Sequence, residues 1–236
     1  PDPDNAVLYG GPLVILTSRV SASASEILAG ALKDYGRAVV VGDDHTFGKG
    51  TVQSLFPLRP GLGALKVTTG LFFRPGGTST QHAGVAADVV TPSLFATDEF
   101  GESALSYSLR APSIDSFLEN GGHQEGWKPV SPEVVEEVVE ELARRSETRQ
   151  TSDEFFETIR EELAKREASE GVVRLADLVA EREENGTDPL AANESGPAPG
   201  NASAAVPEEA KADDDKLTPH AEEALRVLGD LILLSK

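Results

Sequence analysis

The sequence predicts an α/β fold, because two short apolar runs enclose one amphipathic helix near the start of the chain. The runs Pro12–Leu16 and Ala38–Val41 have the length and the unbroken apolar character of buried strands. Between them, Ser25–Tyr35 repeats apolar residues at spacings of three and four, and Gly36 follows where a helix commonly ends. A helix between two buried strands is typical of a βαβ unit, so we expect the two strands to run parallel.

Further strands and helices follow this unit. After a polar loop we expect strands at Thr51–Phe56, Ala64–Thr69, Gly70–Arg74 and, beyond a glycine-rich loop, near Asp88–Val90. Helical periodicity returns later in the chain and predicts helices at Pro132–Arg145, Phe155–Ala164, Leu175–Arg182 and Thr218–Leu234. The order predicts a globular α/β part followed by a helical extension.

Charge separates the same two parts. The 236 residues carry a formal net charge of −19, with 13 acidic and 9 basic residues in 1–130 against 27 and 12 in 131–236. So acidic a chain disfavours nucleic acid as a partner, because the phosphate backbone is bound by Lys and Arg. The chain has no cysteine, which excludes a disulfide scaffold, a cysteine-ligated zinc site and a cysteine nucleophile. Its apolar runs are too short to span a bilayer, so we expect at most a peripheral membrane contact.

We divide the chain into four segments on these grounds. They are a globular α/β part at 1–95, an acidic helical extension at 96–184, a disordered acidic linker at 185–216 and a terminal amphipathic helix at 217–236. The linker is rich in Ala, Gly, Pro and acids, a composition that buries too little apolar surface to fold. The chain opens with P-D-P-D and has no methionine, so we expect it to be the C-terminal piece of a longer protein.

The segment S-A-S-A-S-E at residues 21–26 admits two interpretations. Ser23 and Glu26 match the capping box S-x-x-E, in which the serine caps the helix and the glutamate reaches back. The same strand-to-helix turn suits a nucleophile, because free N–H groups and the helix dipole stabilise a developing oxyanion there. The two interpretations are compatible.

The loop G-D-D-H-T-F-G-K-G at residues 42–50 contains the second candidate. A phosphate-binding loop needs four residues between its glycines and a Ser or Thr after the lysine, and this loop has neither. Lys49 instead stands among glycines and apolar neighbours. Apolar surroundings favour a neutral amine, which can act as a general base. The alternative is a solvated surface lysine.

Together these residues resemble a known family. The run S-A-S-A-S-E-I-L-A-G-A-L-K-D-Y-G-R-A-V-V-V-G, followed by T-F-G-K-G-T-V-Q, resembles the C-terminal processing peptidases, also called tail-specific proteases. Later, G-G-T-S-T-Q-H-A-G-V-A-A-D-V resembles the family's G-G-S-T-Q-x-x-G-V-x-P-D stretch. The resemblance covers about residues 9–92 and looks like the long bacterial periplasmic type. The loop before Lys49 is one residue longer than the family's usual spacing, and Ala87 stands where the family has proline.

The resemblance implies a role for each motif residue. Ser23 would be the nucleophile of a Ser-Lys dyad, Lys49 its general base, and Gln53 the residue that orients the lysine amine. The N–H of Ala24 would be one oxyanion donor. Asp34 matches a motif acid with a structural or supporting role. No metal or organic cofactor is implied.

The resemblance also implies a fold and an activity. The fold would be the latter part of a crotonase/ClpP-like mixed-sheet serine peptidase domain, followed by the acidic helical extension. The activity would be that of a periplasmic endopeptidase acting on protein or peptide substrates with apolar C-terminal tails, with or without an adaptor protein. The family's PDZ domain and its second oxyanion segment would precede Pro1, so we expect the chain alone to be inactive.

Two other functions are considered. A Ser-His-Asp triad using His45 or His82 would make the protein a different kind of hydrolase, although neither histidine belongs to the family's dyad. A catalytically inactive peptidase-like scaffold could bind protein partners through its acidic helices. A scaffold predicts loss of Ser23 or Lys49, and both residues are present.

Overall fold

The computed structural model describes residues 8–118, 136–168 and 217–235. By its contacts the chain divides into one unit formed by Pro1–Arg160 with Thr218–Lys236 and a second unit formed by Glu161–Leu217. The described part of the second unit consists of the end of helix α3 (Glu154–Ala168) and Leu217. The helix expected at Leu175–Arg182 and the linker expected at 185–216 lie outside the described residues.

A three-stranded parallel sheet forms the centre of the first unit. Its strands are β1 (Val14–Thr17), β2 (Val39–Gly42) and β5 (Val89–Val90), in the order β1-β2-β5. Helix α1 (Ala24–Asp34) connects β1 to β2. This arrangement confirms the βαβ unit, and it follows from the run of valines in β2, which is buried on both faces.

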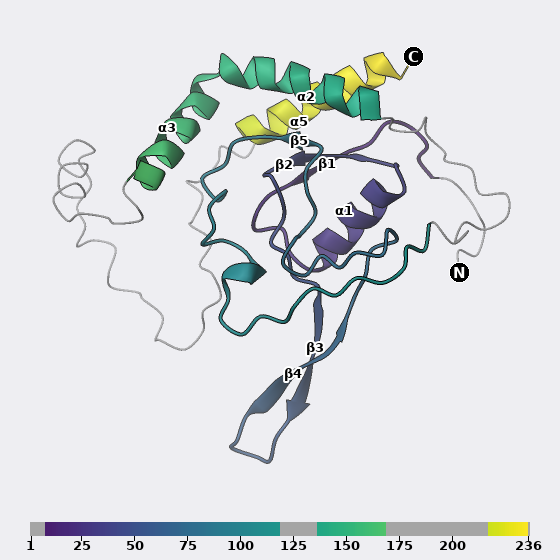
Figure 1. Ribbon diagram of the computed structural model, residues 1–236, viewed down its shortest axis with the longest axis vertical. Coiled ribbons are helices and arrows are strands. Elements are labelled where there is room, and N and C mark those ends of the chain that lie inside the picture. The colour runs from purple at the N-terminus through teal and green to yellow at the C-terminus, as the bar shows by residue number, and fades with distance from the viewer. Residues whose placement is uncertain (1–7, 119–135, 169–216, 236) are drawn as a thin grey trace. The chain divides into compact units, whose positions relative to one another are not determined.

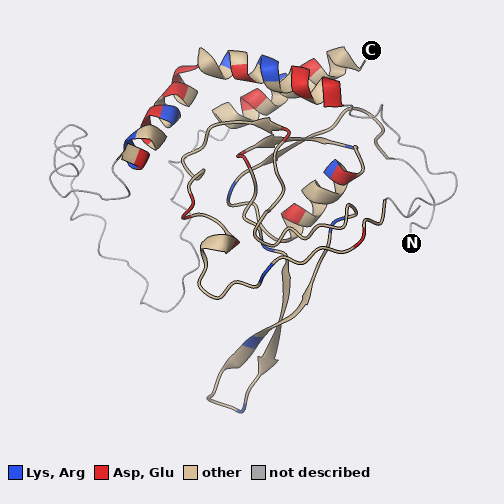
Figure 2. Ribbon diagram, in the orientation of Figure 1, with Lys and Arg blue, Asp and Glu red and all other residues tan. Residues whose placement is uncertain are grey.

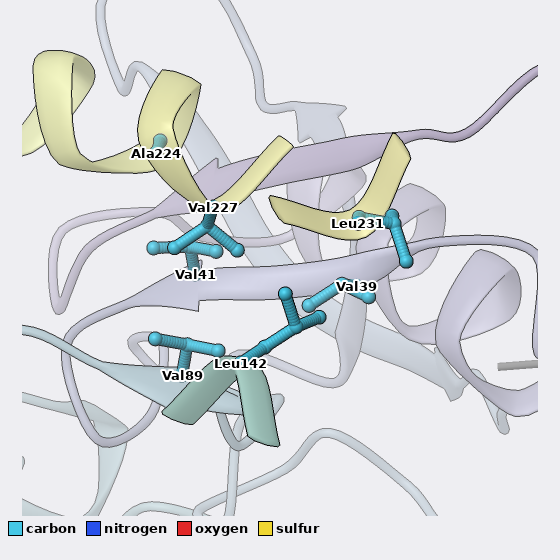
Figure 3. Close-up of a cluster of buried hydrophobic side chains, with 7 residues drawn as sticks. All are labelled: Val39, Val41, Val89, Leu142, Ala224, Val227 and Leu231. Atoms are coloured by element: carbon cyan, nitrogen blue, oxygen red, sulfur yellow. The ribbon is translucent and has the colours of Figure 1, made fainter. Parts of the chain in front are cut away.

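Helices cover both faces of this sheet (Figure 1). Successive strand residues point to opposite faces, so the central valine of β2 lies on one side and its two neighbours on the other. On one side, Val40 packs with Ala29 of α1 and with Val85. The other side packs against α2 (Glu136–Thr151) and α5 (Pro219–Leu234). Figure 3 shows that cluster, which comprises Val39, Val41, Val89, Leu142, Ala224, Val227 and Leu231. The result is a three-layer α/β/α arrangement.

Helix α2 differs from its prediction at its end. The apolar stripe stops at Leu142, so the sequence predicted an end at Arg145, whereas the helix continues to Thr151. Ser146 and Gln150 are buried on the continuing turns, and Gln150 Nε2 donates to the carbonyl of Val90 at 3.0 Å. Polar contacts with the sheet therefore extend the helix beyond its apolar stripe. The start predicted at Pro132 lies outside the described residues.

Ion pairs join α2 to α5, and Figure 2 shows charges of both signs along the two helices. The Glu223 carboxylate has no exposed surface and accepts hydrogen bonds from Ser146 Oγ at 2.7 Å and Arg149 Nη2 at 2.8 Å. Asp230 accepts from Arg145 Nη1 at 2.9 Å and Arg149 Nη1 at 2.7 Å. A buried carboxylate is tolerated only with such partners, so this network fixes how the helices align.

An antiparallel hairpin stands apart from the parallel sheet. Among the described strands, β3 (Thr51–Pro57) and β4 (Ala64–Leu71) pair only with each other, and Figure 1 shows them extending away from the layers. Two strands were expected at Ala64–Thr69 and Gly70–Arg74. They form one strand that ends at Leu71, because Gly70 continues the ladder opposite Val52. The rest of the second expected strand, residues 72–74, is not in a strand. The parallel and antiparallel sheets together confirm a mixed α/β fold.

Large apolar side chains are exposed along this hairpin. They are Val52, Leu55, Phe56, Leu58, Leu62 and Leu65. None of the helices in the described ranges has the length and apolar character to cross a bilayer.

The packing of α2 on the sheet can be tested with one pair of substitutions. Leu142→Ala removes a fully buried side chain, so we expect a loss of about 2–5 kcal/mol in the free energy of unfolding, measured with urea. Leu233→Ala on α5 is the control, because that leucine is 62% exposed and its change should stay within about 0.5 kcal/mol. Equal effects from the two variants would contradict the observed core.

Candidate functional site

Ser23 occupies a strained turn between β1 and α1. It is the N-cap residue of the helix, with φ 59° and ψ −111°. Such a conformation is uncommon for a residue with a side chain and costs about 1–3 kcal/mol, so surrounding contacts must maintain it. The side chain of Ser23 is half-buried, whereas Ala24 and Ser25 after it are exposed.

A single carboxylate holds this turn against the following loop. Glu26 is fully buried in the first turn of α1, and its Oε2 accepts from the N–H of Ser23 at 2.8 Å. This bond is the glutamate half of the predicted capping box. The same carboxylate accepts from Thr46 Oγ1 at 2.6 Å, from Gly48 N at 2.7 Å and from Lys49 N at 2.9 Å. Glu26 therefore does more than cap its own helix.

These bonds bring Ser23 and Lys49 together across 26 residues of sequence. Their amide nitrogens donate to the same oxygen, Glu26 Oε2, at 2.8 and 2.9 Å, so they lie within about 6 Å of each other. Lys49 is half-buried in this position. The two residues that the family resemblance pairs are thus neighbours in the fold.

The glycine-rich motif packs against both sides of the F-G-K-G loop. The N–H of His82 donates to the carbonyl of Gly48 at 2.8 Å, and the N–H of Gly50 donates to Gln81 Oε1 at 2.9 Å. A Cβ on Gly48 would lie 2.7 Å from the carbonyl oxygen of His82, and one on Gly50 would lie 2.5 Å from Ser79 Oγ. Both loop positions therefore require glycine.

The other two side chains expected near the dyad have different positions. Gln53 lies on β3 at a shift in the strand register, where it is exposed. Within the described residues, no hydrogen bond joins its side chain to Lys49. Asp34 ends α1, whose 11 residues span about 16 Å. Its carboxylate pairs with Arg74 and accepts from Gly76 N at 2.9 Å, so it anchors the glycine-rich loop far from Ser23.

The N–H of Ala24 has the location expected of an oxyanion donor. Ala24 is the first residue of α1, so its amide has no acceptor within the helix. It directly follows Ser23 and is exposed. A helix start also concentrates positive potential, which suits a developing negative charge.

No Ser-His-Asp triad is complete among the described residues, because His82 bonds a serine but no carboxylate, and His45 lies near Asp44 but bonds no serine. His45 Nδ1 lies 2.6 Å from the carbonyl of Thr46, and His82 Nε2 lies 2.9 Å from Ser108 Oγ. In the described part of the chain neither imidazole bonds to Ser23. A phosphate-binding loop is also excluded, because β3 rather than a helix follows Lys49 and the loop amides already donate to a carboxylate.

A buried arginine braces the loops beside the site. Arg19 binds Asp44 through Nε at 2.7 Å and Nη2 at 2.9 Å, and its Nη1 donates to the carbonyl of Phe100 at 3.1 Å. Burial alone would raise the pKa of Asp44, but the hydrogen bonds and charge of Arg19 outweigh it and hold that pKa below its usual value. Burial raises the pKa of Asp43, although the Arg19 amide opposes this effect.

Sequence reasoning missed part of this machinery. Glu26 was visible only as a capping residue, and nothing local marked its bonds to the second loop. The pairing of Arg19 with Asp44 spans 25 residues and has no spacing signal. Among the described residues, no cluster of three or more ligating side chains could hold a metal ion.

Comparisons with known proteins agree with the sequence resemblance. Residues 2–91 match the model of Peptidase family S41. The chain is 41% identical to a "Tail-specific protease" of Haemophilus influenzae over 122 residues, which cover 49% of this chain and 17% of that protein. It is 49% identical to a "Carboxy-terminal-processing protease" of Bartonella bacilliformis over 79 residues, 34% of this chain and 18% of that protein.

A solved structure gives a weaker comparison. The "photosystem II D1 C-terminal processing protease" is 43% identical over 37% of this chain and 22% of its own, with a TM-score of 0.32, too low to support an argument about the fold. The chain spans about a fifth of the length of the curated relatives it matches. The matches confirm the resemblance to C-terminal processing peptidases and support a peptidase.

The role of Glu26 predicts a large effect from a near-isosteric change. Glu26→Gln places an amide NH₂ against two buried donors, so we expect a loss of at least about 3 kcal/mol in the free energy of unfolding, measured with urea. Glu222→Gln, at a half-exposed carboxylate on α5, should change stability by less than about 0.5 kcal/mol. Comparable losses in the two variants would refute the proposed role of Glu26 in holding the turn of Ser23 against the loop of Lys49.

The Arg19–Asp44 pair predicts a pH dependence of stability. The lowered pKa means that the stabilising contribution is present above the unfolded pKa of about 3.9 and is lost as pH falls through the folded pKa. Asp44→Asn should therefore be less stable than the parent at pH 7, and the difference should shrink below about pH 4. Urea titrations between pH 7 and 2 measure it. A difference that grows on acidification would contradict the pairing.

Proposed function

We propose that the segment matched to Peptidase family S41 carries the Ser-Lys dyad of a serine endopeptidase, which processes or degrades proteins selected by their C-terminal tails. The observation that carries the proposal is the shared carboxylate oxygen. Through Glu26 Oε2, the backbones of Ser23 and Lys49 are held within about 6 Å of each other. The strained N-cap turn at Ser23 also suits a nucleophile, as does the amide of Ala24, the first residue of α1, which has no acceptor within the helix.

The mechanism is acyl transfer. The neutral amine of Lys49 takes the proton of Ser23 Oγ, and Oγ attacks the carbonyl carbon of a peptide bond. The tetrahedral oxyanion is stabilised by the N–H of Ala24. Protonated Lys49 then gives its proton to the leaving amine, and water hydrolyses the acyl-enzyme by the reverse sequence of proton transfers. No metal or organic cofactor takes part in these steps.

Two motif residues have supporting roles in this proposal. Gln53, whose side chain is free in the described structure, orients the lysine amine once substrate is bound. Asp34 supports the glycine-rich loop through Arg74 and Gly76. A second oxyanion donor is required for full activity, because removal of one such donor costs about 10²–10³ in rate.

The substrates are proteins or peptides that enter in an extended conformation. Strand edges such as those of the hairpin can bind an extended chain by strand addition, and the exposed apolar side chains along it favour apolar tails. An adaptor protein that delivers substrates is compatible with the same surface. The family resemblance supports a periplasmic location.

Three serine and lysine variants test the dyad. Ser23→Ala and Lys49→Ala should each lower cleavage of an unfolded protein bearing an apolar C-terminal tail by at least about a thousandfold. The assay uses the full-length gene product, with circular dichroism to confirm folding. Ser25→Ala is the matched control, because Ser25 is exposed and its Oγ donates to the carbonyl of the neighbouring Ala22, at 2.9 Å.

The outcomes separate the candidate functions. Loss of cleavage in the first two variants alone would establish the dyad and its register. Cleavage at the parental rate by a folded Ser23→Ala or Lys49→Ala variant would exclude it. A parent without cleavage would favour the inactive scaffold that binds partners through its acidic helices.

A further inference from the structure

We propose that Gln81 is a positioning residue for the general base: it fixes the backbone of Lys49 by holding Gly50. This inference rests on the proposed role of Lys49. Gln81 belongs to the motif G-G-T-S-T-Q-H-A-G-V, which resembles the family's motif, but the resemblance implies no function for this glutamine. Its side chain has no exposed surface, although glutamine is usually a surface residue.

The local sequence does not restrict the backbone conformation of Lys49. This lysine stands between two glycines, and Gly48 adopts φ 90°. Glycine has the largest conformational freedom of any residue, so such a segment needs bonds from outside to keep one conformation. Glu26 supplies these bonds on the N-terminal side, through the amides of Gly48 and Lys49. On the C-terminal side a different group must do so.

Gln81 supplies that second attachment. Its Oε1 accepts from the N–H of Gly50 at 2.9 Å, and Phe72 N donates to the carbonyl of Gly50 at 3.0 Å. Both polar backbone groups of the residue after Lys49 are therefore bound. The first of these bonds is made by a side chain, so it can be removed without changing any strand pairing.

The orientation of the Gln81 amide is determined by its surroundings. Its Nε2 donates to the carbonyl of Leu109 at 3.0 Å and to Glu102 Oε1 at 3.3 Å. A flipped amide would place NH₂ against the N–H of Gly50 and an oxygen against two acceptors. Glu102 also donates its own N–H to the carbonyl of Phe47 at 2.8 Å, on the other side of the lysine. Glu102 of η1 (Glu102–Ala104) and Leu109 after it thus complete a brace around the loop.

The test compares two buried glutamines. Gln81→Met keeps the length of the side chain and removes every hydrogen bond. Gln150→Met does the same at a site on α2, where the amide donates to the carbonyl of Val90 at 3.0 Å and to Ser146 Oγ at 2.8 Å. Both variants should lower the melting temperature by a few degrees, because each loses buried hydrogen bonds.

Only Gln81→Met should impair the function of Lys49 as general base. In the full-length gene product we expect its kcat to fall about a hundredfold with KM within twofold of the parent, because a small displacement of a catalytic group costs about this much. Gln150→Met should retain the parental kcat. Equal kcat values for both variants and the parent, or equal losses in the two variants, would overturn the proposal.

A second measurement does not depend on activity. Hydrogen exchange of the amides of residues 48–50 should accelerate at least tenfold in Gln81→Met and remain parental in Gln150→Met. Unchanged exchange in Gln81→Met would overturn the inference even if the parent cleaves no substrate. If the proposed function is wrong, the parent will cleave no substrate or Ser23→Ala will cleave at the parental rate. Neither result depends on Gln81.

Discussion

The candidate site depends on one buried carboxylate. Glu26 accepts four hydrogen bonds, and two of them come from the backbones of the proposed nucleophile and the proposed base. A carboxylate without exposed surface is stable only when such donors compensate its lost hydration. The glycines of the F-G-K-G loop allow this close approach, since side chains at either position would collide with the glycine-rich motif. The two sequence motifs are therefore halves of one packed arrangement.

The sheet that carries this arrangement is completed by distant parts of the chain. Valines on one face of β2 and β5 pack against α2 and α5, whereas α1 covers the other face. The ion pairs of Glu223 and Asp230 align the two covering helices. The acidic helices α2 and α5 are thus part of the core. Their apolar stripes face the sheet, and their charged side chains form ion pairs or are exposed to solvent.

Local sequence patterns predicted much of the fold and part of the candidate site. The remaining features depend on contacts between residues far apart in the sequence. The valine run of β2 and the periodicity of α1 predicted the parallel βαβ unit, and the S-x-x-E spacing predicted the bond from Glu26 to Ser23. The extension of α2 beyond Leu142 could not be predicted, because Ser146 and Gln150 are polar and only their partners on α5 and β5 explain their burial. The bracing by Arg19 and Gln81 likewise depends on distant residues, which lie 25 and 81 positions away for Arg19 and 31 positions away for the bond from Gln81 to Gly50.

The late position of α5 has a consequence for synthesis of the protein. Val227 and Leu231 pack on Val39 and Val41, yet they are translated about 190 residues later, which takes roughly 10–40 s at cellular rates of elongation. During that interval one face of the sheet lacks its final cover, while the turn of Ser23 and its partner loop are already outside the ribosome. The emergence of α5 from the ribosome therefore sets the earliest moment at which the finished core can support the site.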